Sequence, residues 1–144
     1  MTKIAFRKML SANDVGTTGG HQGGVLIPKG EKDLLAFLPH LDPSVKNPDA
    51  WLSCADPDGT PRKFRFVYYN NKLHDTKGTR NEYRITHMTG WFRSMGAREG
   101  DLFEIARDAG SPVYVVSVIM GGDQDRIDLE LPSRIQLRGW RRVH

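Results

Sequence analysis

The chain has 144 residues, of which 38% are hydrophobic and 26% charged, and its formal net charge is +4. This composition is typical of one globular domain, which we place over residues 1–144, and it excludes a disordered chain. No apolar run approaches the roughly 20 residues of a membrane helix, and residues 1–8 lack the apolar segment of a signal peptide, so we expect no membrane partner.

About seven short strands are predicted from alternating hydrophobicity and flanking turn residues. The clearest covers residues 62–70, where Phe64, Phe66 and Tyr68 alternate with more polar positions and form an aromatic face opposite a largely basic one. In chain order, the candidate segments are residues 4–10, 25–28, 51–54, 62–70, 83–87, 102–107, 113–120 and 127–131.

One helix is predicted over residues 31–38, because Leu34, Leu35 and Leu38 share one face. Turn residues at 56–59 and 109–112 separate neighbouring strands. Many short strands with one helix favour an antiparallel barrel or sandwich over alternating strand and helix units. The lone Cys54 lies in a predicted strand and is expected to be an inert buried thiol.

Two polar motifs, residues 10–24 and residues 77–86, carry side chains that are poorly suited to a hydrophobic core. Both combine amide, charged and hydroxyl side chains, the first among glycines and the second beside a strand. Arginine donates twice to guanine, asparagine or glutamine pairs with adenine, and glutamate accepts from cytosine. Two such motifs in one small chain predict two arms that reach into DNA.

The positive charge is concentrated in the middle of the chain. Residues 62–98 contain nine basic and two acidic residues, a net charge of +7, whereas the remainder carries −3. This distribution is typical of a surface that faces phosphates. The alternative is a solvated strand edge, kept soluble by lysine and arginine.

Few sequence features favour catalysis. The motif with the most glycines, residues 19–24, lacks the lysine and hydroxyl residue of a phosphate-binding loop. Asp56, Asp58 and Lys63 could form a metal-dependent nuclease site. However, both carboxylates belong to a proline turn, which explains them without a metal. We therefore expect no metal, no cofactor and no catalytic residue in this chain.

The two motifs resemble the N-terminal effector domain of EcoRII-type restriction endonucleases. The matching runs are LSANDVGTTGGHQ, residues 10–22, and TRNEYRIT, residues 79–86. The resemblance covers about residues 8–88. It implies a mainly β fold, an open antiparallel DNA-binding pseudobarrel of about seven strands with one or two short helices, similar to the plant B-three domains.

The resemblance also implies a function. Two arms would grip the major groove of double-stranded DNA at a short site like 5′-CC(A/T)GG, in the cytoplasm of a bacterial or archaeal cell. A separate or covalently linked nuclease domain would cut the DNA with Mg²⁺. Among the residues of this chain, it implies base contacts from Ser11, Asn13, Asp14, His21, Gln22, Arg80, Asn81, Glu82 and Arg84, and phosphate contacts from Lys8, Lys77, Arg62 and Arg65.

Within this set, Arg80 and Arg84 are candidates for guanine, Glu82 for cytosine, and Asn13 or Asn81 for the central A·T pair. Structural roles compete with these assignments. The alternating residues Arg80, Glu82 and Arg84 could form an ion-pair ladder.

Three further alternatives remain open. Residues 13 and 14 could form a turn or cap, and His21 could be a surface histidine. The aromatic residues of strand 62–70, with Tyr69, could instead stack on single-stranded nucleic acid.

Overall fold

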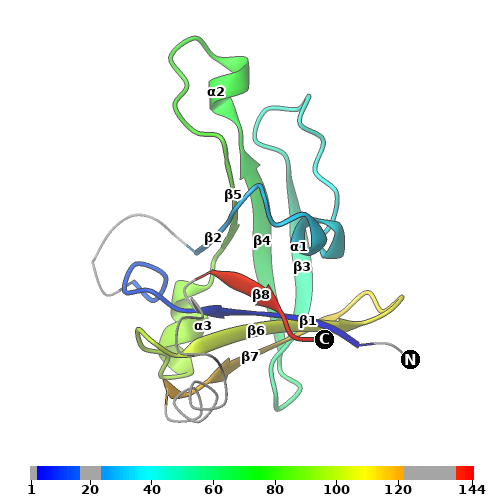
Figure 1. Ribbon diagram of the computed structural model, residues 1–144, viewed down its shortest axis with the longest axis vertical. Coiled ribbons are helices and arrows are strands. Elements are labelled where there is room, and N and C mark those ends of the chain that lie inside the picture. Colours follow the sequence, from blue (N-terminus) through cyan, green and yellow to red (C-terminus); the bar gives the residue numbers. More distant parts are fainter. Residues whose placement is uncertain (1–2, 17–23, 122–138) are drawn as a thin grey trace.

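The computed structural model describes residues 3–16, 24–121 and 139–144 (Figure 1). This part of the chain forms eight strands and three short helices. In chain order they are β1 (Lys3–Met9), β2 (Val25–Ile27), α1 (Lys32–Phe37), β3 (Asp49–Ala55), β4 (Pro61–Tyr69), α2 (Asn71–His74), β5 (Glu82–Thr86), α3 (Thr89–Ser94), β6 (Leu102–Asp108), β7 (Tyr114–Ile119) and β8 (Trp140–Arg142). Among the described residues, none of the helices has the length and apolar character that crossing a membrane requires.

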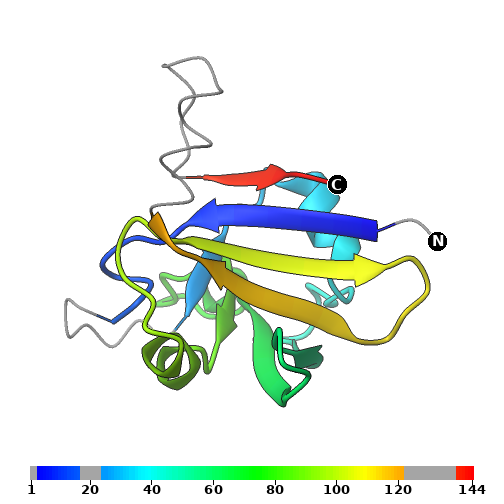
Figure 2. The same cartoon turned by 90° about the horizontal axis from the view of Figure 1, so that it is seen from below.

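The strands form one sheet in the order β2-β5-β4-β3-β7-β6-β1-β8, which curls into a nearly closed barrel. Figure 2 shows β8, β1, β6 and β7 lying side by side in one half of the sheet. The predicted mainly β pseudobarrel is confirmed. One strand pair departs from the antiparallel expectation, because β3 and β7 run parallel and are paired only at Cys54–Tyr114 and Ala55–Val115.

A tryptophan side chain bridges the two edges of the sheet. The edge strands are β2 and β8. The Trp140 indole N–H, on β8, donates to the backbone carbonyl of Leu26 on β2 at 3.0 Å. Trp140 is also buried and contacts the Phe103 ring edge-on. The bond therefore satisfies a buried indole and joins two strands that form no backbone ladder with each other.

Replacing Trp140 with phenylalanine removes this bridge and keeps most of the ring. We expect the free energy of unfolding to fall by about 1 kcal/mol, because the Leu26 carbonyl loses its donor. Urea denaturation measures this change. Trp51→Phe is the control, since Trp51 is 47% exposed on β3, and its effect should stay within about 0.5 kcal/mol. Equal effects of the two substitutions would contradict a bridging role for Trp140.

The core is rich in aromatic side chains, and two helices pack on it from opposite ends of the barrel (Figures 1 and 2). On α1, the Phe37 ring lies 5.1 Å from the Phe6 ring and 5.2 Å from the Tyr114 ring. On α3, Trp91 and Phe92 both contact Phe103. The third helix, α2, contributes no buried residue and stands at the tip of the β4–β5 connection.

Most predicted elements are present. The helix at 31–38 is α1, the turn at 56–59 joins β3 to β4, and the turn at 109–112 joins β6 to β7. Cys54 is buried, as predicted, and burial raises the pKa of its thiol to about 12, which disfavours the reactive thiolate. Helices α2 and α3 and strand β8 were not predicted. The predicted strand at 127–131 lies outside the described residues.

Candidate nucleic-acid interface

The two polar motifs belong to the segments that follow β1 and β4. We call residues 10–24, between β1 and β2, the first arm, and residues 70–86, which comprise α2, the return loop and β5, the second arm. In Figure 1 the second arm rises at the top of the molecule, and the described beginning of the first arm, residues 10–16, lies at the left. The end of the first arm meets the second, because β2 pairs with β5 at Val25–Ile85 and Leu26–Arg84.

Gly24 allows this close approach. Its φ is +89°, and a Cβ atom at this position would lie 1.7 Å from the carbonyl oxygen of Ile85. Only glycine satisfies both the left-handed backbone and the contact. The first arm therefore returns to the sheet directly against the backbone of the second arm.

The described beginning of the first arm is a braced turn. The Asp14 carboxylate accepts the backbone N–H of Ser11 at 2.9 Å, and the Ser11 hydroxyl oxygen accepts the backbone N–H of Asp14 at 3.1 Å. The same carboxylate forms an ion pair with the Lys8 ammonium at 2.6 Å, and both side chains are largely buried. Lys8 and Asp14 are thus held against each other, at the base of the arm.

The rest of the first arm is only partly described. The turn continues through a bond from the Gly16 N–H to the Asn13 carbonyl at 3.2 Å. His21 and Gln22, both predicted base contacts, lie outside the described residues.

The base of the second arm is fixed by the loop at residues 41–48. Asn70 is fully buried, and its amide nitrogen donates to the carbonyls of Pro43 and Val45. Asn70 and Asn47 also exchange two bonds between side-chain oxygen and backbone N–H, at 2.7 and 3.1 Å. Lys46 and Asp75 add an exposed ion pair. These hydrogen bonds fix the start of the second arm to the loop at residues 41–48.

The return loop of the second arm packs closely on α2. A Cβ atom on Gly78 would lie 2.1 Å from the carbonyl oxygen of Asn71, so the loop has no room for a side chain there. The Asn71 side-chain oxygen accepts the backbone N–H of Arg80 at 2.8 Å, and the Lys72 N–H donates to the Arg80 carbonyl at 3.0 Å. These contacts fix the backbone on both sides of Arg80.

Arg80, Glu82 and Arg84 form the ion-pair ladder that their alternation suggested. Glu82 lies 3.5 Å from the Arg80 Nε and accepts a short bond from the Arg84 Nε. Partial burial raises the pKa of Glu82, but the bond and charge of Arg84, with those of Arg80, outweigh it and hold the pKa below its usual range. The Arg80 side chain is 34% exposed and that of Arg84 12%, so Arg80 is the more accessible of the two.

Asn81 is oriented from inside the barrel. The Tyr68 hydroxyl donates to the Asn81 side-chain oxygen, and the Tyr68 ring stacks on Tyr83 with centroids 4.2 Å apart. One face of the oxygen is therefore engaged by the protein, while the two amide N–H groups of Asn81 remain as donors.

The predicted phosphate contacts lie at different places on the molecule. Lys77 is exposed on the return loop of the second arm. Arg65 lies on the same face of the sheet as Arg84 and forms an ion pair with Asp49 at 2.7 Å. Arg62 lies at the other end of β4, seven residues before Tyr69, or roughly 23 Å along the strand. The structure does not bring Arg62 next to the second arm.

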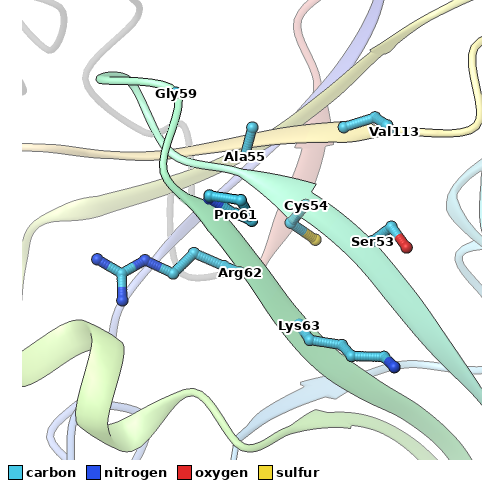
Figure 3. A pocket seen from close by; sticks show the side chains of 8 residues that line it. All are labelled: Ser53, Cys54, Ala55, Gly59, Pro61, Arg62, Lys63 and Val113. Carbon is cyan, nitrogen blue, oxygen red and sulfur yellow. The ribbon is translucent and has the colours of Figure 1, made fainter.

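Arg62 lines a hollow of about 430 Å³ at the β3–β4 hairpin (Figure 3). Its guanidinium pairs with the buried carboxylate of Asp56 at 2.9 Å. Asp56 and Asp58 also both accept the backbone N–H of Thr60. These contacts account for both carboxylates as turn residues. Among the described residues, no group of three or more His, Cys, Asp or Glu side chains could hold a metal ion.

The aromatic face of β4 belongs to the core. Phe64, Phe66 and Tyr68 are each no more than 5% exposed. The fourth aromatic residue, Tyr69, points to the opposite face and lies beneath Arg80, with the guanidinium carbon 3.7 Å from the ring centroid. Tyr69 was predicted only as a stacking platform for single-stranded nucleic acid, and Asn71 was not predicted as a site residue. Their position shortly before the second motif, which begins at residue 77, was the available signal.

Most of this chain matches a known protein family. The family model described as "Restriction endonuclease EcoRII, N-terminal" matches residues 1–129. The type II restriction enzyme EcoRII of Escherichia coli is 42% identical over 90 residues, which are 58% of this chain and 20% of that protein. The chain thus spans about a fifth of the length of that curated relative.

Two solved structures share the fold. A structure described as an Arabidopsis FUS3–DNA complex superposes with a TM-score of 0.61 and 22% identity, over 81% of this chain and 97% of that one. The B3 domain of the UbaLAI restriction endonuclease, solved with cognate DNA, gives a TM-score of 0.55 and 21% identity, over 98% of this chain and 85% of that one.

Proposed function

The chain belongs to the family of EcoRII N-terminal restriction endonuclease domains, and on this premise we propose that it is a DNA-binding effector domain of a restriction enzyme. It binds double-stranded DNA and recognises its sequence through the two arms, which enter the major groove. Phosphates are attracted by the +7 segment at residues 62–98, which includes the whole second arm.

One observation carries this proposal. The second arm presents a guanidinium, that of Arg80, which is positioned by its neighbours and remains accessible. A held guanidinium on the loop just before β5 suits bidentate donation to a guanine edge. The two solved structures that share this fold are both bound to DNA, which supports the same partner class.

The base contacts follow the two polar motifs. Arg80 reads guanine, with Arg84 beside it, Glu82 accepts from cytosine, and Asn13 or Asn81 contacts the central A·T pair. The proposed base contacts of the first arm are Ser11, Asn13, Asp14, His21 and Gln22.

The proposed phosphate contacts are four basic residues. Lys77, Arg65 and Arg62 contact phosphates and set the register. Lys8 belongs to the same group, and its ion pair with Asp14 indicates that these two residues also shape the arm.

The whole protein would resemble the E. coli relative in function. The site is a short sequence like 5′-CC(A/T)GG, and a nuclease domain, linked or separate, would supply Mg²⁺-dependent cleavage. The present chain contributes recognition in a bacterial or archaeal cytoplasm, and it needs no cofactor of its own.

Fluorescence anisotropy tests the proposal. The purified chain is titrated into a labelled duplex containing CC(A/T)GG, a scrambled duplex of the same composition, and the single strands, at one stated salt concentration. We expect the first duplex to bind most tightly. Equal affinity for both duplexes would contradict readout of this site, and tighter binding of the single strands would establish the stacking alternative. Cleavage of the duplex after Mg²⁺ addition would show that the chain is itself a nuclease.

Lys77→Ala is expected to weaken binding of every duplex and to reduce the slope of log K against log salt by about 0.9, because one phosphate contact is lost. Titrations at four salt concentrations measure the slope. Lys32→Ala on α1 is the control, since it removes the same charge from an exposed lysine outside both arms. A Lys77→Ala effect confined to the specific duplex would assign this lysine to a base instead.

A further inference from the structure

The Arg80 side chain is held on two sides. The Tyr69 ring lies under the guanidinium, at 3.7 Å between its carbon and the ring centroid. The Glu82 carboxylate lies 3.5 Å from Nε. A stacked aromatic ring fixes the plane of a guanidinium, whereas a carboxylate beside it fixes which edge faces the protein. The remaining N–H donors therefore point in a defined direction.

The Arg80 backbone is held as well. Its N–H is accepted by the Asn71 side chain, and its carbonyl accepts the N–H of Lys72. Asn71 is the first residue of α2, nine positions before Arg80, so the helix acts as a clamp across the base of the loop. Backbone and guanidinium are fixed by different residues, and neither Tyr69 nor Asn71 carries a charge.

Resting on the proposed function, we propose that Tyr69 and Asn71 are positioning residues that determine the sequence specificity of the second arm through Arg80. Bidentate donation to one guanine requires both the location and the plane of the guanidinium to be correct. Attraction to phosphate requires only its charge. Loss of the ring or of the clamp therefore lowers the affinity for the cognate site and leaves general affinity for duplex DNA intact.

Substitutions at Tyr69 separate these effects. Tyr69→Leu removes the ring and Tyr69→Phe keeps its face. For Tyr69→Leu we expect the preference for the CC(A/T)GG duplex over the scrambled duplex to fall roughly tenfold, with an unchanged salt slope. Tyr69→Phe should retain the preference, and Asn71→Ala should behave like Tyr69→Leu. Thermal denaturation of each variant reports whether the fold is kept.

Trp51→Leu is the matched control. Trp51 is another accessible ring with a cation over it, the Lys63 ammonium at 5.6 Å, but it lies outside both arms. Its loss should leave the preference unchanged. If Trp51→Leu lowered the preference for the CC(A/T)GG duplex as much as Tyr69→Leu does, the proposal would be overturned.

A double-mutant cycle tests the route of the effect. In an Arg80→Ala background, Tyr69→Leu should cause no further loss of preference, because the group that it positions is gone. The same loss in both backgrounds would show that Tyr69 acts independently of Arg80 and would overturn the proposal.

NMR of the free protein tests the positioning without DNA. The Arg80 side-chain protons above the ring should be shifted upfield in the parent chain and in Tyr69→Phe, and should lose this shift in Tyr69→Leu. Absence of the shift in the parent chain would overturn the inference. If the shift is present but the parent chain binds both duplexes equally, the proposed sequence readout fails, and with it the specificity role that rests on it.

Discussion

Arg80→Ala is expected to weaken binding of the CC(A/T)GG duplex by about 1–3 kcal/mol, roughly 5- to 150-fold, with little change for a scrambled duplex. Arg80 is the more exposed arginine of the ladder, and its guanidinium is oriented by Tyr69 and Glu82. The substitution removes two donors from a base edge, whereas the other basic residues of the +7 segment continue to attract phosphates.

Anisotropy titrations of both duplexes measure the two affinities separately. Arg93→Ala provides the control, because Arg93 is an exposed arginine of the same basic segment and lies on α3, outside both arms. It should lower the two affinities alike, if at all. A parallel fall for Arg80→Ala would identify Arg80 as a phosphate contact and remove the principal argument for base readout.

Gly24→Ala is expected to lower the free energy of unfolding by about 3 kcal/mol. The added Cβ would lie 1.7 Å from the Ile85 carbonyl oxygen, and this neighbour is backbone, so it cannot rotate away. Relief requires β2 to move from β5, which opens the ladder at Val25–Ile85. The expected cost combines backbone strain with lost pairing.

Urea denaturation measures this cost, and Gly59→Ala isolates its cause. Gly59 has nearly the same backbone angle, φ +87°, but an added Cβ would meet nothing within 4 Å. Only the strain of the left-handed backbone remains there, and we expect about 1 kcal/mol. Equal losses of stability for the two substitutions would show that the contact with the Ile85 carbonyl oxygen adds nothing to the effect of Gly24→Ala.

The fold was predictable where local pattern and tertiary contacts agree. The alternation at residues 62–70 indicated both β4 and its core face, and the leucines of residues 31–38 indicated α1. Helix α3 has only six residues and is stabilised by burial of Trp91 and Phe92. Strand β8 has three residues and exists through its pairing with β1. Such short elements depend on distant partners, which local periodicity does not contain.

The interface was predictable to a similar extent. Spacing by two placed Arg80, Glu82 and Arg84 on one face, and the ladder is present. The base of the second arm was not predictable, because Asn70 bonds to residues 23 to 27 positions earlier in the chain. A pair of asparagines such as Asn70 and Asn71 is typical of a turn, although here one is a buried anchor and the other clamps Arg80.

The narrow parallel contact between β3 and β7 has a mechanical consequence. It divides the sheet into two halves, β2-β5-β4-β3 and β7-β6-β1-β8, and the Trp140–Leu26 bond joins their outer edges. The second arm arises within one half, whereas the first starts on β1 in one and ends on β2 in the other. The distance between the bases of the two arms therefore depends on how the two halves of the sheet are positioned relative to each other.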